Sequence, residues 1–306
     1  ILEHKSMKNI TILIVSYFSS KHLKRLITNL IEKSDQPNAL QFLIVDNTNG
    51  RDKALKEILR NNRNIESLMN DGNHLQRSVS HAGGLDLGFS HIKSDYTLII
   101  DPDVYVFREK WDTLFLEQLN KQESLIIGAP YPQWKVGKVH DYPSVVFMFF
   151  KTNDLKQTNF SFYPFPNILK KVKNSILRKI IRLGFLSSKQ SLNKSFKLRN
   201  LVKWLEKKTG ITSPDTGNKI IEALPLFNIK PLCFEAKYSR DTLAEEDTPI
   251  YKIAKEFEVF FLHNELIMTH MYGSEVFYWK TKRGGDLHYW EKLISQLEGE
   301  SYEKLS

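Results

Sequence analysis

The N-terminal half of this chain alternates short apolar runs, rich in β-branched residues, with segments whose apolar residues recur at helical spacing. An apolar run such as residues 10–15 suits a strand that is buried on both faces of a parallel sheet. Repeated strand–helix units predict an α/β fold, a doubly wound sheet whose ligands bind at the carboxyl ends of the strands. We expect strands at residues 10–15, 42–45, 65–69, 96–100 and 125–129, and helices over 23–31, from 53, over 81–92 and over 111–119.

Asp101, Pro102 and Asp103 directly follow the most convincing of these strands. On extended backbone, residues i and i+2 project to the same side about 7 Å apart, so both carboxylates can address one hard cation. The proline, which donates no backbone hydrogen bond, suits the end of a strand. A simple turn would use the same residue types. Because the pair ends a strand where ligands bind, we favour a ligand site.

The helix expected over residues 81–92 begins with His81, Gly83 and Gly84. The glycines would permit a tight entry turn and close backbone approach to a ligand. His81 could donate a hydrogen bond to a phosphate or a sugar hydroxyl, and a helix N-terminus favours anions. The spacing lacks a strict nucleotide-binding fingerprint, so packing explains the glycines equally well.

The second half of the chain is less regular. We expect strands at residues 145–150, 232–234, 259–262 and 266–269, a helix over 220–224 and an amphipathic helix over 290–297. His270 follows the last of these strands. Neutral imidazole is a ligand for Mn²⁺ and can share a site with carboxylates, although a histidine in this position is often structural.

The net charge of +9 is concentrated in one segment of the chain. Residues 166–208 contain thirteen lysines and arginines and one acid, Glu206, which gives +12 and leaves 9 − 12 = −3 for everything else. Within it, apolar residues recur at near four-residue spacing over 168–183, which predicts a cationic amphipathic helix suited to an anionic membrane surface. A helix packed on the domain with a solvated basic face is the alternative. The segment has few aromatic residues for stacking bases, which disfavours nucleic acid as the partner.

A single cysteine, Cys233, excludes an internal disulfide framework and a cysteine-rich zinc site, and favours an intracellular, reducing compartment. The longest apolar stretches fall well short of the ~18–20 residues that a membrane-spanning helix needs.

The order of these motifs resembles glycosyltransferase family 2, whose members have the GT-A fold. The resemblance is good over residues 9–150 and loose beyond them. It rests on segments 12–17, 43–47, 81–88, 96–104, 111–112 and 128–130, which read ILIVSY, LIVDN, HAGGLDLG, YTLIIDPDV, WD and GAP.

The resemblance implies an inverting, metal-dependent enzyme built as one GT-A domain with a basic helical insertion at 166–208. Residues 7–150 would bind the nucleotide sugar and residues 151–306 the acceptor. The donor would contact Ser16, Tyr17, Asp46, His81, Gly84, Asp101 and Asp103. Asp101, Asp103 and His270 would hold Mn²⁺ or Mg²⁺.

The resemblance also implies a carboxylate base that deprotonates the acceptor hydroxyl. Asp215 lies in a loop between Pro214 and Gly217 and precedes a helix; Glu246 lies in the acidic run 245–247 and precedes both a helix and His270. We favour Asp215, because an isolated carboxylate is easier to bury and tune. An N-cap role for Asp215 and a solvated helix start for the acidic run are the structural alternatives.

The function implied is transfer of a sugar from a UDP-, GDP- or dTDP-sugar to a hydroxyl of a glycan or lipid-linked acceptor, as in cell-surface polysaccharide or lipopolysaccharide synthesis. We expect a cytoplasmic protein, peripheral on the inner face of the cytoplasmic membrane. A nucleotidyltransferase on a related fold and a basic nucleic-acid-binding protein are the alternatives.

Overall fold

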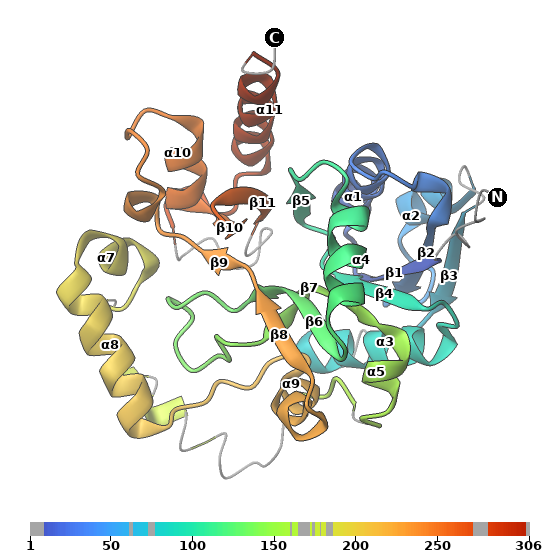
Figure 1. Cartoon of the computed structure of the whole chain (residues 1–306), viewed down its shortest axis with the longest axis horizontal. Helices are drawn as coiled ribbons and strands as arrows, with labels where there is room; N and C mark the ends of the chain where they lie inside the picture. The colour runs from blue at the N-terminus through green and yellow to red at the C-terminus, as the bar shows by residue number, and fades with distance from the viewer. Residues whose placement is uncertain are drawn as a thin grey trace.

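The computed structural model of the protein describes residues 9–60, 64–72, 77–159, 161–164, 172, 175–177, 179–181, 186–271 and 281–303. A seven-stranded sheet forms its centre (Figure 1). Strand β7 runs antiparallel to its neighbours β4 and β6, and the other neighbouring strands are parallel. The α/β fold predicted from the sequence is therefore confirmed, and its central sheet is mixed. The strand order is β3 (Ile65–Met69), β2 (Leu40–Asp46), β1 (Ile10–Ser16), β4 (Tyr96–Ile100), β7 (Pro143–Lys151), β6 (Leu125–Pro130) and β8 (Lys230–Cys233).

Helices cover both faces of this sheet. Because successive side chains of a strand point to opposite faces, Ile12 of β1 packs into one core and Leu13 into the other. One face is covered by α1 (Ser20–Glu32), α2 (Lys53–Arg60) and α4 (Trp111–Lys121), and the other by α3 (Arg77–His91), α5 (Thr152–Lys156) and α9 (Asn218–Ala223). Short 3₁₀ helices lie at Pro37–Ala39, Leu224–Phe227 and Ser239–Thr242.

A second, antiparallel sheet consists of β5 (Val104–Val106), β11 (Glu265–His270), β10 (Glu258–Leu262) and β9 (Glu235–Ala236), in that order. Helices α10 (Pro249–Glu256) and α11 (Leu287–Glu303) pack on it around Phe257 and Trp290. The Trp290 indole donates a hydrogen bond of 3.2 Å to the Thr269 hydroxyl of β11. This contact ties the C-terminal helix to the strand that carries His270.

The basic segment contains α7 (Lys189–Lys194) and α8 (Phe196–Thr209), which lie on the opposite side of the molecule from β3 (Figure 1). Ser188 and Ser195 cap the two helices by accepting backbone hydrogen bonds from Ser191 and Leu198. The amphipathic helix predicted over 168–183 lies largely outside the described residues; those that are described, 172, 175–177 and 179–181, are helical. Among the helices that the structure describes, none has the length and apolar character required to cross a membrane.

Candidate active site

Two strand pairings bring Asp101 and Asp103 next to a histidine far along the chain. Asp101 follows β4 at the edge where the carboxyl ends of β1, β2 and β4 meet. The chain then joins the second sheet, where Val104 pairs with His270. The backbone N–H of Met271 also donates to the Asp103 carbonyl at 2.9 Å. The backbone ladder therefore fixes the histidine against the two aspartates.

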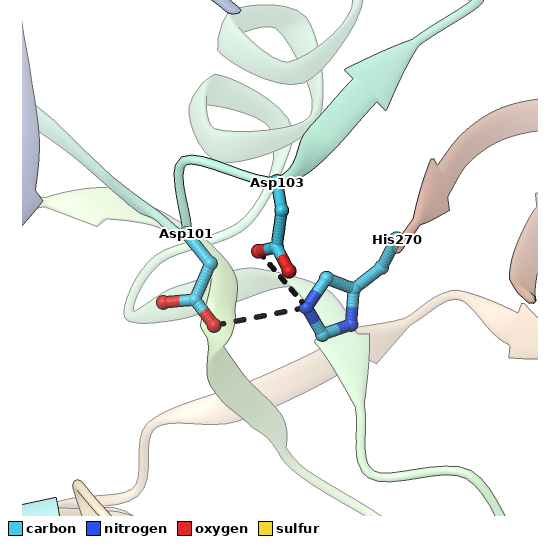
Figure 2. Close-up of side chains that lie close together, drawn as sticks. All are labelled: Asp101, Asp103 and His270. Atoms are coloured by element: carbon cyan, nitrogen blue, oxygen red, sulfur yellow. Dashed lines mark ion pairs between the residues drawn. The ribbon is translucent and has the colours of Figure 1, made fainter. Parts of the chain in front are cut away.

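The three side chains form a compact cluster (Figure 2). One potential ligand atom from each lies within 4.8 Å of the others. His270 Nε2 is 3.3 Å from Asp103 Oδ1 and 3.9 Å from Asp101 Oδ2. His270 and Asp103 are buried, whereas Asp101 is partly exposed. The cluster therefore presents two carboxylates and one imidazole nitrogen toward a common point that solvent reaches from the Asp101 side.

Glu258 holds the other nitrogen of the His270 ring. Its Oε2 lies 2.9 Å from His270 Nδ1, and its Oε1 lies 2.8 Å from Lys135 Nζ. Glu258 and Lys135 are 2% and 3% exposed at their side chains, so this is a buried ion pair. Because Nδ1 donates to Glu258, Nε2 is left facing the aspartates, which is the arrangement found behind metal-binding histidines.

The charges of the cluster depend on one another. Burial alone would lower the pKa of His270, but Asp103 and Glu258 outweigh it and raise the pKa to about 10. Burial opposes ionisation of Glu258 as well, yet Lys135 and His270 lower its pKa to about 2. Burial raises the pKa of Asp101. The pKa of Asp103 is lowered despite burial, because His270 is its partner. Two crowded carboxylates repel each other, and a divalent cation between them would offset that repulsion.

His81 contributes a fourth polar group to this edge. Its Nε2 is 3.6 Å from Asp101 Oδ1. The helix entry predicted here is wrong, because α3 begins at Arg77 and places His81, Gly83 and Gly84 inside the helix. His81 is therefore directed at Asp101 by a helix surface and not by a backbone turn.

The glycines of α3 serve close packing of the helix on the sheet. A Cβ at Gly84 would lie 2.8 Å from Asn47 Oδ1 and 2.9 Å from a Val15 methyl, and one at Gly88 would lie 2.3 Å from a Leu13 methyl. These distances leave no room for any larger residue without movement of the sheet or helix. Packing, the second interpretation of these glycines, accounts for Gly84 in the structure.

Ser16 and Asp46 pair at the ends of β1 and β2. Asp46 is buried, and its carboxylate accepts hydrogen bonds from the Thr48 backbone and hydroxyl and from Gly50 N, at 2.6–2.9 Å. It therefore shapes the loop that follows β2. Tyr17, in contrast, is 53% exposed and offers its ring to solvent beside this edge.

The two base candidates lie in different surroundings. Asp215 precedes α9, and its Oδ2 accepts a hydrogen bond of 2.6 Å from Lys138 Nζ. Burial would raise the pKa of Asp215, but Lys138 lowers it below its ordinary value. Glu246 is exposed before α10 and accepts a hydrogen bond of 3.2 Å from the Tyr251 hydroxyl. The Lys135 charge opposes the burial that raises the pKa of Asp101 and also helps to lower the pKa of Asp215.

Sequence reasoning missed Glu258 and Lys135. Glu258 is the first residue of a strand and is followed by four apolar residues. By itself this pattern predicts a solvent-exposed glutamate at the start of a buried strand. Lys135 lies in a loop without any motif. A hairpin of the two expected strands at residues 259–262 and 266–269 brings this part of the chain near His270, but the register that places Glu258 opposite His270 appears only in the structure.

Comparison with known proteins identifies the family. Residues 11–175 match the family model described as Glycosyl transferase family 2. A mannosyltransferase of Pyrobaculum calidifontis, solved with GDP-Man and Mn²⁺, is 15% identical with a TM-score of 0.40; the match covers 50% of this chain and 47% of that one. TarS of S. aureus, residues 1–349, is 16% identical with a TM-score of 0.38, and half of each chain is covered.

This chain thus spans about half the length of those solved structures. No curated protein sequence matches it significantly. The family match extends over more than half of the 306 residues and contains β2, β4, all of β1 except Ile10, and both aspartates of the cluster. The chain belongs to glycosyl transferase family 2.

Proposed function

We propose that this glycosyltransferase is a metal-dependent, inverting enzyme that transfers a sugar from a nucleotide sugar to a hydroxyl of a glycan or lipid-linked acceptor. The observation that carries the proposal is the Asp101–Asp103–His270 cluster at the carboxyl edge of the sheet. In doubly wound sheets this edge is where ligands bind. A nucleotidyltransferase and a nucleic-acid-binding protein, the two alternatives, find no support in the family match.

The donor set of the cluster fits Mn²⁺ or Mg²⁺. Two carboxylate oxygens and one imidazole nitrogen are suitable ligands for Mn²⁺, and carboxylate oxygens suit Mg²⁺. Glu258 already orients His270 so that Nε2 faces both aspartates. When bound, such a cation would neutralise the charge that develops on the departing nucleoside diphosphate.

We assign donor binding to the N-terminal half, residues 7–150. The loop after Ser16, with the exposed Tyr17, and the loop shaped by Asp46 border the edge where the nucleotide would lie. His81 is aimed at Asp101 and would donate a hydrogen bond to a donor phosphate or sugar hydroxyl. Gly84 acts indirectly, by allowing α3 to approach the sheet.

We assign acceptor binding to the second half, residues 151–306, together with the ends of β6 and β8. A cavity of about 450 Å³ opens there, a size typical of small-ligand sites. Tyr131 lines this cavity, and its ring centroid is 5.4 Å from Nζ of Lys135, the partner of Glu258. Aromatic and polar side chains that suit a sugar line the cavity, among them Tyr131, Gln133, Phe196, Asn200, Tyr238 and Asp241.

The donor and the metal can be tested together. In the presence of Mn²⁺, one of the UDP-, GDP- or dTDP-sugars should raise the melting temperature by about 5 °C at roughly a hundredfold excess over its Kd. The same compound should be hydrolysed slowly to the nucleoside diphosphate, and EDTA should abolish both effects. A protein that responds to none of these nucleotides, with or without metal, would contradict the proposed activity. The anomeric configuration of the product, read by NMR, tests inversion.

The Glu258→Gln variant tests how His270 is oriented. The substitution takes from the buried Lys135 the carboxylate at 2.8 Å, so we expect a loss of about 3 kcal/mol in the free energy of unfolding. We also expect Mn²⁺ affinity to fall by about 10–100-fold, because the histidine loses the carboxylate that fixes its tautomer. Denaturant unfolding and Mn²⁺ titration measure the two effects separately.

The double variant Lys135→Met, Glu258→Gln is the matched control for that experiment. It also removes the buried Lys135 charge and should recover part of the stability while Mn²⁺ affinity stays low. Wild-type Mn²⁺ affinity in either variant would show that Glu258 has no part in orienting the ligand.

We propose a cytoplasmic location, because a chain with a single cysteine suits a reducing compartment.

A further inference from the structure

The outer surface of α8 combines exposed apolar side chains with lysines. Lys197, Leu201, Trp204 and Lys208 follow one another at spacings of four, three and four residues, so they share one face of the helix. All four are exposed, with Leu201 at 46% and Trp204 at 55%. These four residues are the α8 outer face.

The opposite side of α8 explains why this face is turned outward. Val202 is buried, and Leu198 and Leu205 pack beside it in a core cluster with Trp134 and Tyr238. The helix therefore already has one apolar stripe engaged with the protein. The α8 outer face is a second apolar stripe that the core does not use, so burying the first stripe cannot account for Leu201 and Trp204.

A neighbouring helical segment also has some apolar side chains packed in the core and others exposed to solvent. Leu177 and Ile181 belong to the core cluster that also holds Val202. In the same segment Val172, Ile176 and Ile180 are 57–58% exposed, at four-residue spacing. Seven of the fifteen exposed large hydrophobic side chains among the described residues lie between positions 172 and 204. Exposed apolar surface is thus concentrated in the most cationic part of the chain.

The lysines around this surface are available for a partner. Lys197, Lys203, Lys207 and Lys208 are exposed, and no ion pair involves them within the part of the chain that the structure describes. Arg199, in contrast, pairs with Asp241 at 2.8 Å and Glu206 pairs with His140 at 3.1 Å. The charges that α8 uses for its own packing face inward; of the four lysines, Lys203 borders the cavity of about 450 Å³, whereas Lys197, Lys207 and Lys208 lie outside it.

We propose that the α8 outer face docks on an anionic lipid bilayer. Trp and Leu flanked by lysines suit the interface of a membrane, where the apolar groups insert beside acyl chains and the ammonium groups remain at the headgroups. Each lysine near an anionic surface contributes roughly a fivefold gain in affinity. A nucleic acid would use the charge and leave Leu201 without a role, and a second copy of this +9 protein would meet like charge across the lysines.

This docking does not depend on the proposed donor or metal, so co-sedimentation with vesicles can test it alone. The full chain should bind phosphatidylcholine vesicles that contain phosphatidylglycerol at least tenfold more tightly than pure phosphatidylcholine vesicles. Leu201→Ser with Trp204→Ser, and separately Lys197→Glu with Lys208→Glu, should each weaken binding at least tenfold. Melting temperatures and donor hydrolysis should match wild type, which shows that the variants are folded.

Matched controls carry the same chemical changes elsewhere. Leu243→Ser alters a leucine that is 95% exposed, and Lys53→Glu with Lys56→Glu reverses two exposed charges on α2. Both controls should bind vesicles as wild type does. The proposal is overturned if the wild-type protein does not bind anionic vesicles, or if the α8 variants bind them as tightly as wild type. It is also overturned if the α8 substitutions abolish self-association or DNA binding and leave vesicle binding intact.

Discussion

Replacement of Asp103 by asparagine should reduce sugar transfer by about 10³-fold, equivalent to roughly 4 kcal/mol of transition-state stabilisation. Asp103 is buried, and its Oδ1 lies 3.3 Å from His270 Nε2, so it is the aspartate most tightly built into the cluster. Asparagine keeps the shape and removes the charge that would hold the cation. Mn²⁺ affinity, measured by titration, should fall together with the rate.

Asp35→Asn is the control for Asp103→Asn. Asp35 lies on the surface after α1, where it pairs with Lys110 at 3.1 Å. Solvent screens this exposed pair, so we expect its neutralisation to leave transfer and Mn²⁺ affinity at the wild-type level. If Asp103→Asn protein transfers sugar within tenfold of wild type in the presence of Mn²⁺, the metal role of the cluster is wrong.

The second large effect concerns the base. We expect Asp215→Asn to lower kcat by about 10²–10⁴-fold while Mn²⁺ affinity and donor binding change little. Lys138 lowers the pKa of Asp215, so its carboxylate is ionised at neutral pH and can accept the proton of an acceptor hydroxyl. Single-turnover rates, measured beside donor affinity, separate this loss from a binding defect.

Glu246→Gln is the matched comparison, because it neutralises the rival carboxylate before α10. It should retain most activity if Asp215 is the base. Full activity in Asp215→Asn protein, combined with a large loss in Glu246→Gln protein, would reassign the base to the acidic run 245–247.

The Lys138→Met variant tests independently whether Asp215 is the base. Loss of the neighbouring charge raises the pKa of Asp215, so the acidic limb of the kcat profile should move to higher pH. An acidic limb that does not move would speak against Asp215 even where its substitution lowers the rate.

The strand pattern was predictable because buried parallel strands have little freedom in composition. The apolar runs at the first, second and fourth strands appear in the structure as β1, β2 and β4, within one or two residues of the expected limits for β1 and β4. Even the short third strand forms, as β3.

The start of helix α3 was not predictable, because Gly83 and Gly84 suggest a turn locally. At Gly84 the absence of a side chain instead lets α3 pack closely on the sheet, a contact that the local sequence does not show.

The basic segment shows a similar division. Its charge and its apolar periodicity were evident from the residues alone. Which apolar side chains face the core and which face outward depends on packing against Trp134 and Tyr238, residues distant in the chain. The exposure of Leu201 and Trp204 on α8 is therefore a property of the tertiary structure.

By itself, the sequence determined the alternating α/β framework and the two aspartates at the end of its best strand. The tertiary structure decided what stands beside them. Leu262 pairs with Glu265 at the turn. If this register continued without interruption, Phe257 would lie opposite His270. A register shift between Phe260 and Phe261 places Glu258 there instead. Opposed side chains on an antiparallel pair share one face, so this shift by one residue delivers a carboxylate to His270 Nδ1 in place of a phenyl ring. Strand β11 of this hairpin also pairs with β5, a segment distant in the chain, which brings His270 beside Val104 and so next to Asp103.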